Sequence, residues 1–348
     1  MSSDRIRVGV VGVGAIGVWH VQTYKGDANC ELVALCDRDA KWLEHAQREY
    51  DVKLGFSTFE ELVACEEIDA VSVCLPTVFH APVTVAALRH GKHVLCEKPM
   101  AANAPQAREM AAAAREAGKA LMIGYNQRLG GDIQYLKRYI DEGNLGEVYF
   151  ARTGWRRAMG ALPPSTAHRA TGSYNRNWFN EKAMAGGVTT DLGSHVVDLA
   201  MYLMGFPKVK QVVGCAYTKF GPQSAASQGT TFDADDHSVG FAKFENGASM
   251  MIEASFGCYV EKDTVFQAIY GDQGGAHRES GEPLKLFSRA AGSFATVIPR
   301  LDLPSTTPMN HFIECLVHEK TPIITPEEGV AVTEILDGIY ASSEADTQ

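Results

Sequence analysis

The chain has 348 residues, 45% of them hydrophobic and 21% charged, which is typical of a globular protein long enough to form two domains. A net charge of −10, without a long run of Lys or Arg, argues against nucleic acid or an anionic membrane as a partner. No apolar stretch approaches the roughly 20 residues that span a bilayer, and the first residues show no signal-peptide pattern, so we expect a cytoplasmic protein.

The first part of the chain, residues 1–125, alternates short β-rich runs with longer helical segments. Its strands are almost continuously apolar, which is typical of a parallel sheet covered on both faces, so we predict a doubly wound α/β domain. The expected strands are Ile6–Val11, Glu31–Cys36, Ala70–Leu75, His93–Cys96 and Ala120–Gly124, and the expected helices are Gly17–Lys25, Ala40–Tyr50, Phe59–Ala64, Ala81–His90 and Ala104–Ala117.

The second part, residues 126–348, has long strands with little helix between them, which predicts an α/β domain built on an open, largely antiparallel sheet. Glu245-Asn246-Gly247 predicts a hairpin turn, because Asn-Gly adopts positive φ angles. Two loop-like stretches, 160–181 and 220–235, are long enough to be binding loops or lids. The expected strands are Glu147–Arg157, Val209–Thr218, Ser238–Phe244, Ala248–Phe256 and Thr264–Tyr270, and the expected helices are Asp132–Glu142, Thr190–Met204 and Pro326–Ala341.

The eight cysteines are scattered without a Cys-x-x-Cys pair, so we expect reduced thiols in the core. The nearest approach to a zinc site is His90, His93 and Cys96. These residues run from a helix end into a strand and would not present three ligands to one point, so we expect no metal.

A glycine turn follows the first strand, with Gly12, Gly14 and Gly17 spaced as in a dinucleotide-binding Rossmann domain. Ala15 and Ile16, between these glycines, are assigned to the same cofactor site, and the N-terminus of the helix expected from Gly17 would offer free amides to a pyrophosphate. Asp37, at the end of the second strand, would bind the adenosine ribose. We therefore predict NAD as the cofactor, with NADP possible because Arg38 could pair with a 2′-phosphate. The alternative is a tight connection in which Asp37 only caps the helix at Ala40.

Two further segments lie where strands of this sheet end, the position at which open α/β sheets bind ligands. Leu75-Pro76-Thr77 and His80 would line the cofactor crevice, or form a turn with a capping threonine and an exposed histidine. In Glu97-Lys98-Pro99 the proline would set the direction in which Lys98 leaves the strand. The ammonium group could then stabilise an alkoxide as it develops. We assign Glu97 and Lys98 to the cofactor site as well.

In the second part, Asp191 and His195 are four residues apart on one face of the expected helix. An imidazole beside a carboxylate can exchange a proton near neutral pH, and Asp198 could orient the ring. On spacing alone, a buried core histidine and an aspartate that favours the first turn of the helix explain the pattern equally well.

In order and spacing, these four motifs together resemble the glucose-fructose oxidoreductase, inositol dehydrogenase and MocA (Gfo/Idh/MocA) family, over essentially the whole chain. The resemblance implies that Lys98, Asp191 and His195 are the catalytic residues. It also implies a sugar, cyclitol or sugar derivative as the substrate and a homodimer or homotetramer formed through the sheet of the second domain. Apolar candidates for that interface are Phe241, Phe244, Met250, Ile252 and Phe256.

Two other groups of residues are weaker candidates. Aromatic and polar side chains in the loop before the expected catalytic helix could bind a sugar, although an ordinary packed loop explains them equally well. Side chains at the end of the last parallel strand could also line the substrate pocket. These substrate-binding candidates are Tyr125, Asn126, Arg128, Tyr174, Arg176 and Trp178. The second group, Asp233, Asp235, Asp236 and His237, could suggest a metal, but we interpret it as a solvated run of charge.

The sequence therefore predicts an NAD(P)-dependent oxidoreductase that transfers a hydride from a secondary hydroxyl of a sugar, cyclitol or sugar derivative to the nicotinamide. In an alternative, the same residues use a retained cofactor to oxidise the substrate transiently, and a glycoside is cleaved or a leaving group eliminated. Release of reduced cofactor distinguishes the two. A nucleotide-sensing module would instead bind NAD without turnover.

Overall fold

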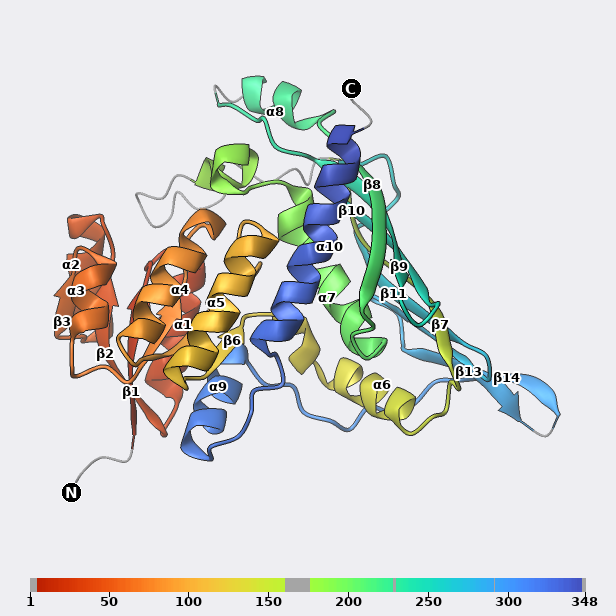
Figure 1. Cartoon of the computed structure of the whole chain (residues 1–348), viewed down its shortest axis with the longest axis horizontal. Helices are drawn as coiled ribbons and strands as arrows, with labels where there is room; N and C mark the ends of the chain where they lie inside the picture. The colour runs from red at the N-terminus through yellow and green to blue at the C-terminus, as the bar shows by residue number, and fades with distance from the viewer. Residues whose placement is uncertain (1–4, 160–175, 228–229, 291, 346–348) are drawn as a thin grey trace. The chain divides into compact units, whose positions relative to one another are not determined.

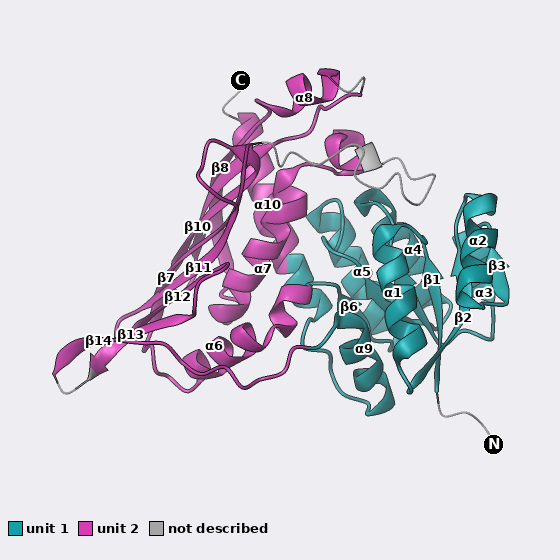
Figure 2. Ribbon diagram, turned by 180° about the vertical axis from the view of Figure 1, so that it is seen from behind, with its two compact units in different colours: residues 1–125, 168–174, 306–330 teal, residues 126–167, 175–305, 331–348 magenta. Residues whose placement is uncertain are grey.

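The computed structural model describes residues 5–159, 176–227, 230–290 and 292–345, and it divides into two compact units (Figures 1 and 2). Among the described residues, unit 1 consists of 5–125 and 306–330, and unit 2 of the remainder. Residues 306–330, which we expected in the second domain, thus cluster with the first unit. None of the helices in these ranges has the length and the apolar content needed to cross a membrane.

Unit 1 is built on a six-stranded parallel sheet in the order β3-β2-β1-β4-β5-β6. The strand order reverses between β1 and β4, which confirms the predicted doubly wound fold. The strands are β1 (Ile6–Val11), β2 (Cys30–Cys36), β3 (Leu54–Phe56), β4 (Ala70–Val73), β5 (His93–Cys96) and β6 (Leu121–Ile123). The helices are α1 (Ala15–Gly26), α2 (Ala40–Tyr50), α3 (Phe59–Ala64), η1 (Thr77–Phe79), α4 (His80–Arg89), α5 (Ala104–Ala117) and α9 (Pro308–Val317).

Local sequence signals explain where several helices of unit 1 begin and end. The Asn103 side chain accepts the N–H of Gln106 at the start of α5, and Gly118 ends that helix in the left-handed conformation with a φ of 62°. Asp39 caps α2 and Thr58 caps α3 in the same way as Asn103 caps α5. These three helices have the limits that the sequence predicts.

Unit 2 contains an eight-stranded sheet in the order β14-β13-β12-β11-β7-β10-β9-β8. Among the described strands β7 and β10 pair in parallel and the other neighbours are antiparallel, which confirms the predicted, largely antiparallel sheet. Gly247, at a φ of 89°, turns the chain between β9 and β10. The strands are β7 (Val148–Ala158), β8 (Val209–Tyr217), β9 (His237–Phe244), β10 (Ser249–Cys258), β11 (Thr264–Gly271), β12 (Gly275–Glu279), β13 (Lys285–Ala290) and β14 (Ser293–Val297).

The helices of unit 2 include one element of unusual form. The expected helix Thr190–Met204 is a π-helix, η6 (Thr189–Gly193), followed directly by α7 (Ser194–Leu203). The others are η2 (Asn126–Leu129), α6 (Gly131–Asp141), η4 (Arg176–Asn180), η5 (Lys182–Met184), α8 (Gly221–Ser227) and α10 (Pro326–Ala345), the last of which begins in unit 1. Helix α8 lies within the stretch 220–235 that we expected to be a loop.

One face of the unit 2 sheet is covered by α7 and α10, whereas no described helix covers the other face (Figures 1 and 2). Gly214 and Gly240 pair across β8 and β9, and a Cβ on Gly240 would lie 2.8 Å from Cδ1 of Ile339. These glycines therefore let α10 pack close to the strands. We call the uncovered side the open face.

The open face corrects our list of interface candidates. Phe241 lies on it, in register between Val213 and Met251. Four of the five candidates are at most 4% exposed and belong to the core on the helix-covered side: Phe244, Met250, Ile252 and Phe256.

Candidate active site

The glycine turn of unit 1 requires its glycines. Gly12 has a φ of +88°, and a Cβ there would lie 2.5 Å from the carbonyl oxygen of Cys74. A Cβ on Gly17 would lie 1.9 Å from the carbonyl oxygen of Gly12. Gly14 is the N-cap of α1, and no side chain in the described part of the chain caps the first-turn amides of Ala15 and Ile16. Such a helix terminus fits a pyrophosphate.

Asp37 lies directly beside this turn. Its carboxylate is 4% exposed, and Oδ2 accepts the N–H of Val13 at 3.0 Å while Oδ1 accepts the N–H of Asp39 at 3.0 Å. The alternative in which Asp37 caps α2 is wrong, because Asp39 accepts the amides at the start of that helix. Arg38 is exposed.

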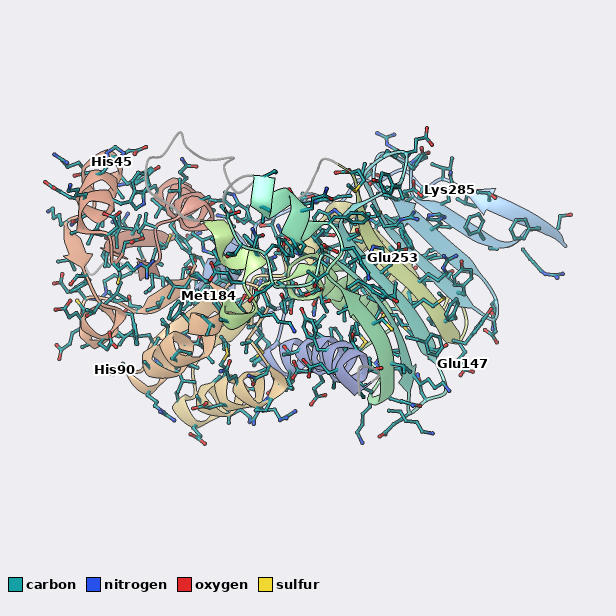
Figure 3. The ribbon with its side chains drawn as sticks, turned by 90° about the horizontal axis from the view of Figure 1, so that it is seen from above. His45, His90, Glu147, Met184, Glu253 and Lys285 are labelled. Carbon is teal, nitrogen blue, oxygen red and sulfur yellow. The ribbon has the colours of Figure 1, made fainter. Side chains whose placement is uncertain are left out.

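Trp42 is a neighbour of the glycine turn that the sequence does not reveal. Its indole Nε1 donates to the carbonyl oxygen of Val13, and its ring packs 5.1 Å from the ring of His45, which Figure 3 labels. Side chains from the β2–α2 segment thus hold both the N–H and the carbonyl of Val13. No periodicity or motif signals this contact.

Thr77 supplies a polar group at the end of β4. Its hydroxyl is buried and has no hydrogen-bond partner among the described residues, whereas Leu75 and Pro76 are half-buried. A buried hydroxyl of this kind requires a partner. Together with the uncapped start of α1 and with Asp37, Thr77 fits a bound NAD, which supplies a hydride acceptor when present.

His80 is not an exposed histidine. It is 1% exposed, with Nδ1 at 2.8 Å from the carbonyl oxygen of Pro99 and Nε2 at 2.8 Å from that of Leu75. Burial lowers the pKa of His80 below its ordinary value, although both carbonyl contacts act in the opposite direction. The ring therefore joins the segments that follow β4 and β5, and both of its nitrogens contact main-chain carbonyl oxygens.

Glu97 and Lys98 follow β5 and differ in exposure. Lys98 is half-buried and precedes a cis peptide bond to Pro99. Glu97 is 7% exposed, and its Oε1 lies 3.0 Å from Nε2 of His20. Burial opposes ionisation of Glu97, but the hydrogen bond from His20 and the charges of His20 and Lys98 outweigh it and hold the pKa below its ordinary value. The Glu97 side chain, which we assigned to the cofactor, is thus engaged by His20.

Asp191 and His195 belong to unit 2, on η6 and α7. Asp191 is half-buried in the π-helical turn, a form often found at functional sites. His195 is 9% exposed, and its ring lies 5.7 Å from that of Trp155 on β7. Trp155 also packs against the apolar cluster around Leu192, a contact that the sequence does not indicate. An aromatic residue in a predicted β-strand does not by itself indicate that it packs against a histidine of a distant helix.

A buried carboxylate, that of Asp235, holds the start of η6, and a second one, that of Asp236, holds the segment before α8. Oδ2 of Asp235 accepts the N–H and the hydroxyl of Thr189, at 2.9 and 2.6 Å, and Oδ1 accepts the Tyr340 hydroxyl at 2.7 Å. Oδ2 of Asp236 accepts the amides of 219, 220 and 221. Asp235 is 3% and Asp236 0% exposed, so our interpretation of this run as solvated charge is wrong for both. Within the described residues no group of three or more His, Cys, Asp or Glu could hold a metal.

The structure also corrects our assignment of Arg128 as a substrate-binding candidate. It is 0% exposed and forms an ion pair with Asp198, with Nε to Oδ2 at 2.9 Å, beneath the rings of Tyr202 and Phe206. Its guanidinium is therefore buried in unit 2 instead of facing a substrate. Asp198, which we considered as an orienting group for His195, binds this arginine.

The other substrate-binding candidates are placed differently. Tyr125 is 1% exposed and Asn126 is exposed. The Trp178 ring stacks on Phe179 at 3.7 Å. Tyr174 and the side chain of Arg176 lie outside the described residues.

Comparison with known proteins identifies both halves of the chain. Residues 6–125 match the family model described as "Oxidoreductase family, NAD-binding Rossmann fold", and residues 133–277 match the "GFO/IDH/MocA C-terminal domain". D-glucoside 3-dehydrogenase of Escherichia coli (strain K12) is 29% identical over 359 aligned positions, covering 100% of this chain and 98% of the relative. A putative UDP-kanosamine synthase oxidoreductase subunit of Amycolatopsis mediterranei is 31% identical, covering 78% of this chain and 74% of the relative.

A solved structure has the same fold. Levoglucosan dehydrogenase in complex with NADH and levoglucosan superposes with a TM-score of 0.83 at 22% identity, over 98% of each chain. The family models, the relatives and the six-stranded sheet with its glycine turn all indicate the same family and fold. The chain belongs to the Gfo/Idh/MocA family of oxidoreductases and has its NAD-binding Rossmann fold.

Proposed function

We propose that the protein is an NAD-dependent dehydrogenase that oxidises a secondary hydroxyl of a sugar, cyclitol or sugar derivative. One observation carries the proposal: in a chain of this family, Lys98 follows β5 of the sheet that carries the glycine turn, Asp191 lies in the π-helix η6, and His195 lies in the first turn of α7. A nucleotide sensor without turnover has no use for these three residues together.

We assign a separate role to each of the three residues. His195 accepts the hydroxyl proton, and packing against Trp155 restricts the ring to few orientations. Lys98 donates a hydrogen bond to the oxygen that becomes an alkoxide. Asp191 binds a neighbouring hydroxyl. NAD, when bound, accepts the hydride.

The names of the relatives suggest the first substrates to try. Besides D-glucoside 3-dehydrogenase, they include levoglucosan dehydrogenase of Pseudarthrobacter phenanthrenivorans and inositol 2-dehydrogenase of Rhizobium meliloti. All three names describe oxidation of a ring carrying secondary hydroxyls. We therefore propose a pyranose or cyclitol ring as the substrate class.

The test is a panel of methyl D-glucosides, levoglucosan and inositols, incubated with NAD and followed by nicotinamide absorbance and by analysis of the sugar product. We expect formation of NADH in equal amount to a keto sugar. Cleaved glycoside without net NADH would show a cofactor-recycling enzyme instead. Tight NAD binding without any sugar product would contradict both.

We also propose that the protein is a homodimer or homotetramer that buries the open face of unit 2. Val213 and Met251, on either side of Phe241 in the sheet, are 47% and 46% exposed. Glu253, labelled in Figure 3, lies two residues further along β10, opposite Val239. Light scattering should give a multiple of the monomer mass. Met251→Asp should lower that mass, whereas Arg48→Asp on exposed α2 should not. A monomeric wild type would refute this assembly.

A further inference from the structure

Two buried histidines hold the residues on either side of Lys98. His20 of α1 is 0% exposed and contacts the Glu97 carboxylate, and His80 of α4 contacts the carbonyl of Pro99. Lys98 is the residue between these two contacts, and its own backbone N–H donates to Oε2 of Glu97 at 3.2 Å. The Glu97 carboxylate therefore links the imidazole of His20 to the main chain of Lys98.

The second ring nitrogen of His20, Nδ1, also has a hydrogen-bond partner. This nitrogen lies 3.2 Å from the Ser72 hydroxyl on β4, and that hydroxyl lies 2.7 Å from the Tyr24 hydroxyl. Ser72 is 0% and Tyr24 1% exposed. Because hydrogen bonds at both ring nitrogens fix the plane of an imidazole, Nε2 is directed at Glu97. The chain Tyr24, Ser72, His20 and Glu97 runs from α1 across the sheet to the end of β5.

Gly124, the residue after the neighbouring strand β6, leaves room for this carboxylate because it has no side chain. A Cβ on Gly124 would lie 2.9 Å from Oε1 of Glu97, and the Gly124 amide donates to the carbonyl oxygen of Cys96 at 2.8 Å. A buried carboxylate is costly unless it is hydrogen-bonded, so a purely structural role could be served by an apolar side chain. Because this carboxylate lies between His20 and the Lys98 amide, it can fix the position of the Lys98 main chain, which an apolar side chain could not do.

We propose that His20 is a positioning residue for the hydride-transfer step: through the Glu97 carboxylate it fixes the main chain from which the Lys98 ammonium reaches the reacting oxygen. The inference rests on the proposed function, in which Lys98 stabilises the alkoxide. A displacement of about 1 Å at such a group is enough to slow a reaction by roughly 100-fold. His20 touches neither substrate nor cofactor in this role.

The first test needs no substrate. Hydrogen exchange of the Lys98 amide is measured by NMR without NAD in wild type, in His20→Leu, which lacks the donor, and in His20→Gln, whose amide N–H can replace it. We expect exchange about tenfold faster in His20→Leu and near wild type in His20→Gln. His93→Asn, at the other end of β5, is the matched control and should leave this amide unchanged. Equal exchange in all four proteins would overturn the inference.

The second test separates positioning from stability. Single-turnover hydride transfer to NAD is measured with a methyl D-glucoside and its deuterated form, per folded molecule, alongside the Kd for NAD. His20→Leu should transfer hydride about tenfold more slowly, with a larger isotope effect and a Kd within about threefold of wild type. A histidine that only stabilises the fold predicts a lower Tm and an unchanged rate.

Gly124→Ala provides an independent route if His20→Leu does not fold. Its Cβ should displace the Glu97 carboxylate and slow hydride transfer, whereas Gly26→Ala, which meets no atom within 4 Å, should not. A full rate in Gly124→Ala would contradict the proposal.

A double variant tells failure of this inference from failure of the proposed function. If His20 acts through Lys98, His20→Leu should cause no further loss in a Lys98→Met background. An additive loss would mean that His20 acts by another route. A Lys98→Met enzyme as fast as wild type, or a wild type that oxidises no sugar of the panel, would instead refute the proposed function, and the positioning role with it.

Discussion

The indole Nε1 of Trp42 lies 2.5 Å from the carbonyl oxygen of Val13, in the middle of the glycine turn, while the N–H of Val13 donates to Asp37. The peptide groups on both sides of Val13 are thus held by one segment, the end of β2 and the first turn of α2. This fixes a turn whose neighbouring amides would bind the pyrophosphate.

Trp42→Phe should therefore weaken NAD binding while leaving the fold intact. Loss of one hydrogen bond costs about 0.5–1.5 kcal/mol, so the Kd should rise roughly two- to tenfold. Calorimetric titration with NAD measures the change. Lys41→Ala, next to it on the exposed side of α2, is the control, and an unchanged Kd in Trp42→Phe would show that the turn needs no support from the indole.

Wild type should bind NAD at least about tenfold more tightly than NADP, because the Asp37 carboxylate accepts ribose hydroxyls and repels a 2′-phosphate. Asp37→Ala should weaken NAD binding and narrow the difference. Arg38→Ala should leave NAD affinity unchanged and weaken NADP binding further. Titrations with both cofactors check these expectations, and tighter binding of NADP by wild type would contradict the assignment.

His195→Ala and Lys98→Met should each lower turnover by roughly 100-fold or more, as loss of an acid–base group or of an alkoxide partner requires. NAD binding should stay within a few-fold of wild type, because neither change removes the glycine turn. His90→Ala, an exposed histidine at the end of α4 that Figure 3 labels, is the matched control. Near wild-type rates in both site variants would refute the mechanism, whatever the stability of the variants.

Gly187→Ala should destabilise unit 2 by about 3 kcal/mol or more. Gly187 has a φ of +111°, and a Cβ there would lie 1.9 Å from Oδ1 of Asp235, which Tyr340 holds in place. Gly205→Ala places alanine near the left-handed region, at a φ of +76°, without any atom within 4 Å, and should cost about 1 kcal/mol. Urea unfolding of both variants measures the two losses, and a loss in Gly187→Ala no greater than in Gly205→Ala would show that Asp235 can move away.

Stability should fall as the pH decreases from about 6.5 to 4, because the folded protein resists protonation of His93. Burial, helped by the charge of Lys119, lowers the pKa of His93 to about 4, and its Nδ1 accepts the N–H of Ala120 at 3.1 Å. The unfolded chain binds a proton in this window that the folded chain does not, so the stabilisation is complete above the unfolded pKa and is lost as the pH falls.

His93→Asn keeps an acceptor for the Ala120 amide and removes the titration, so its stability should depend less on pH in this window. Some dependence should remain, because burial also lowers the pKa of His80 and His311. Urea unfolding at pH 7 and pH 5 measures the difference. A pH dependence equal to that of wild type would show that His93 is not responsible.

Local sequence signals determined most of unit 1 and the positions of its motifs. Strand β1 and helices α2 and α5 have the predicted limits because apolar runs, caps at Asp39 and Asn103 and the glycine at 118 are all contiguous in sequence. Short edge strands such as β3 and β14 escaped prediction. A strand of three to five residues gains its hydrogen bonds from a distant partner, and its own sequence carries little pattern.

The partners of the polar side chains were decided only by the tertiary structure. Spacing along the chain cannot show that His20 binds Glu97, 77 residues away, or that Arg128 binds Asp198. The same holds for Asp235, whose charged neighbours in sequence suggested solvent but whose carboxylate lies buried against Thr189. Burial decides between a solvated charge and a buried, hydrogen-bonded one, and burial depends on which elements pack together, which no local pattern encodes.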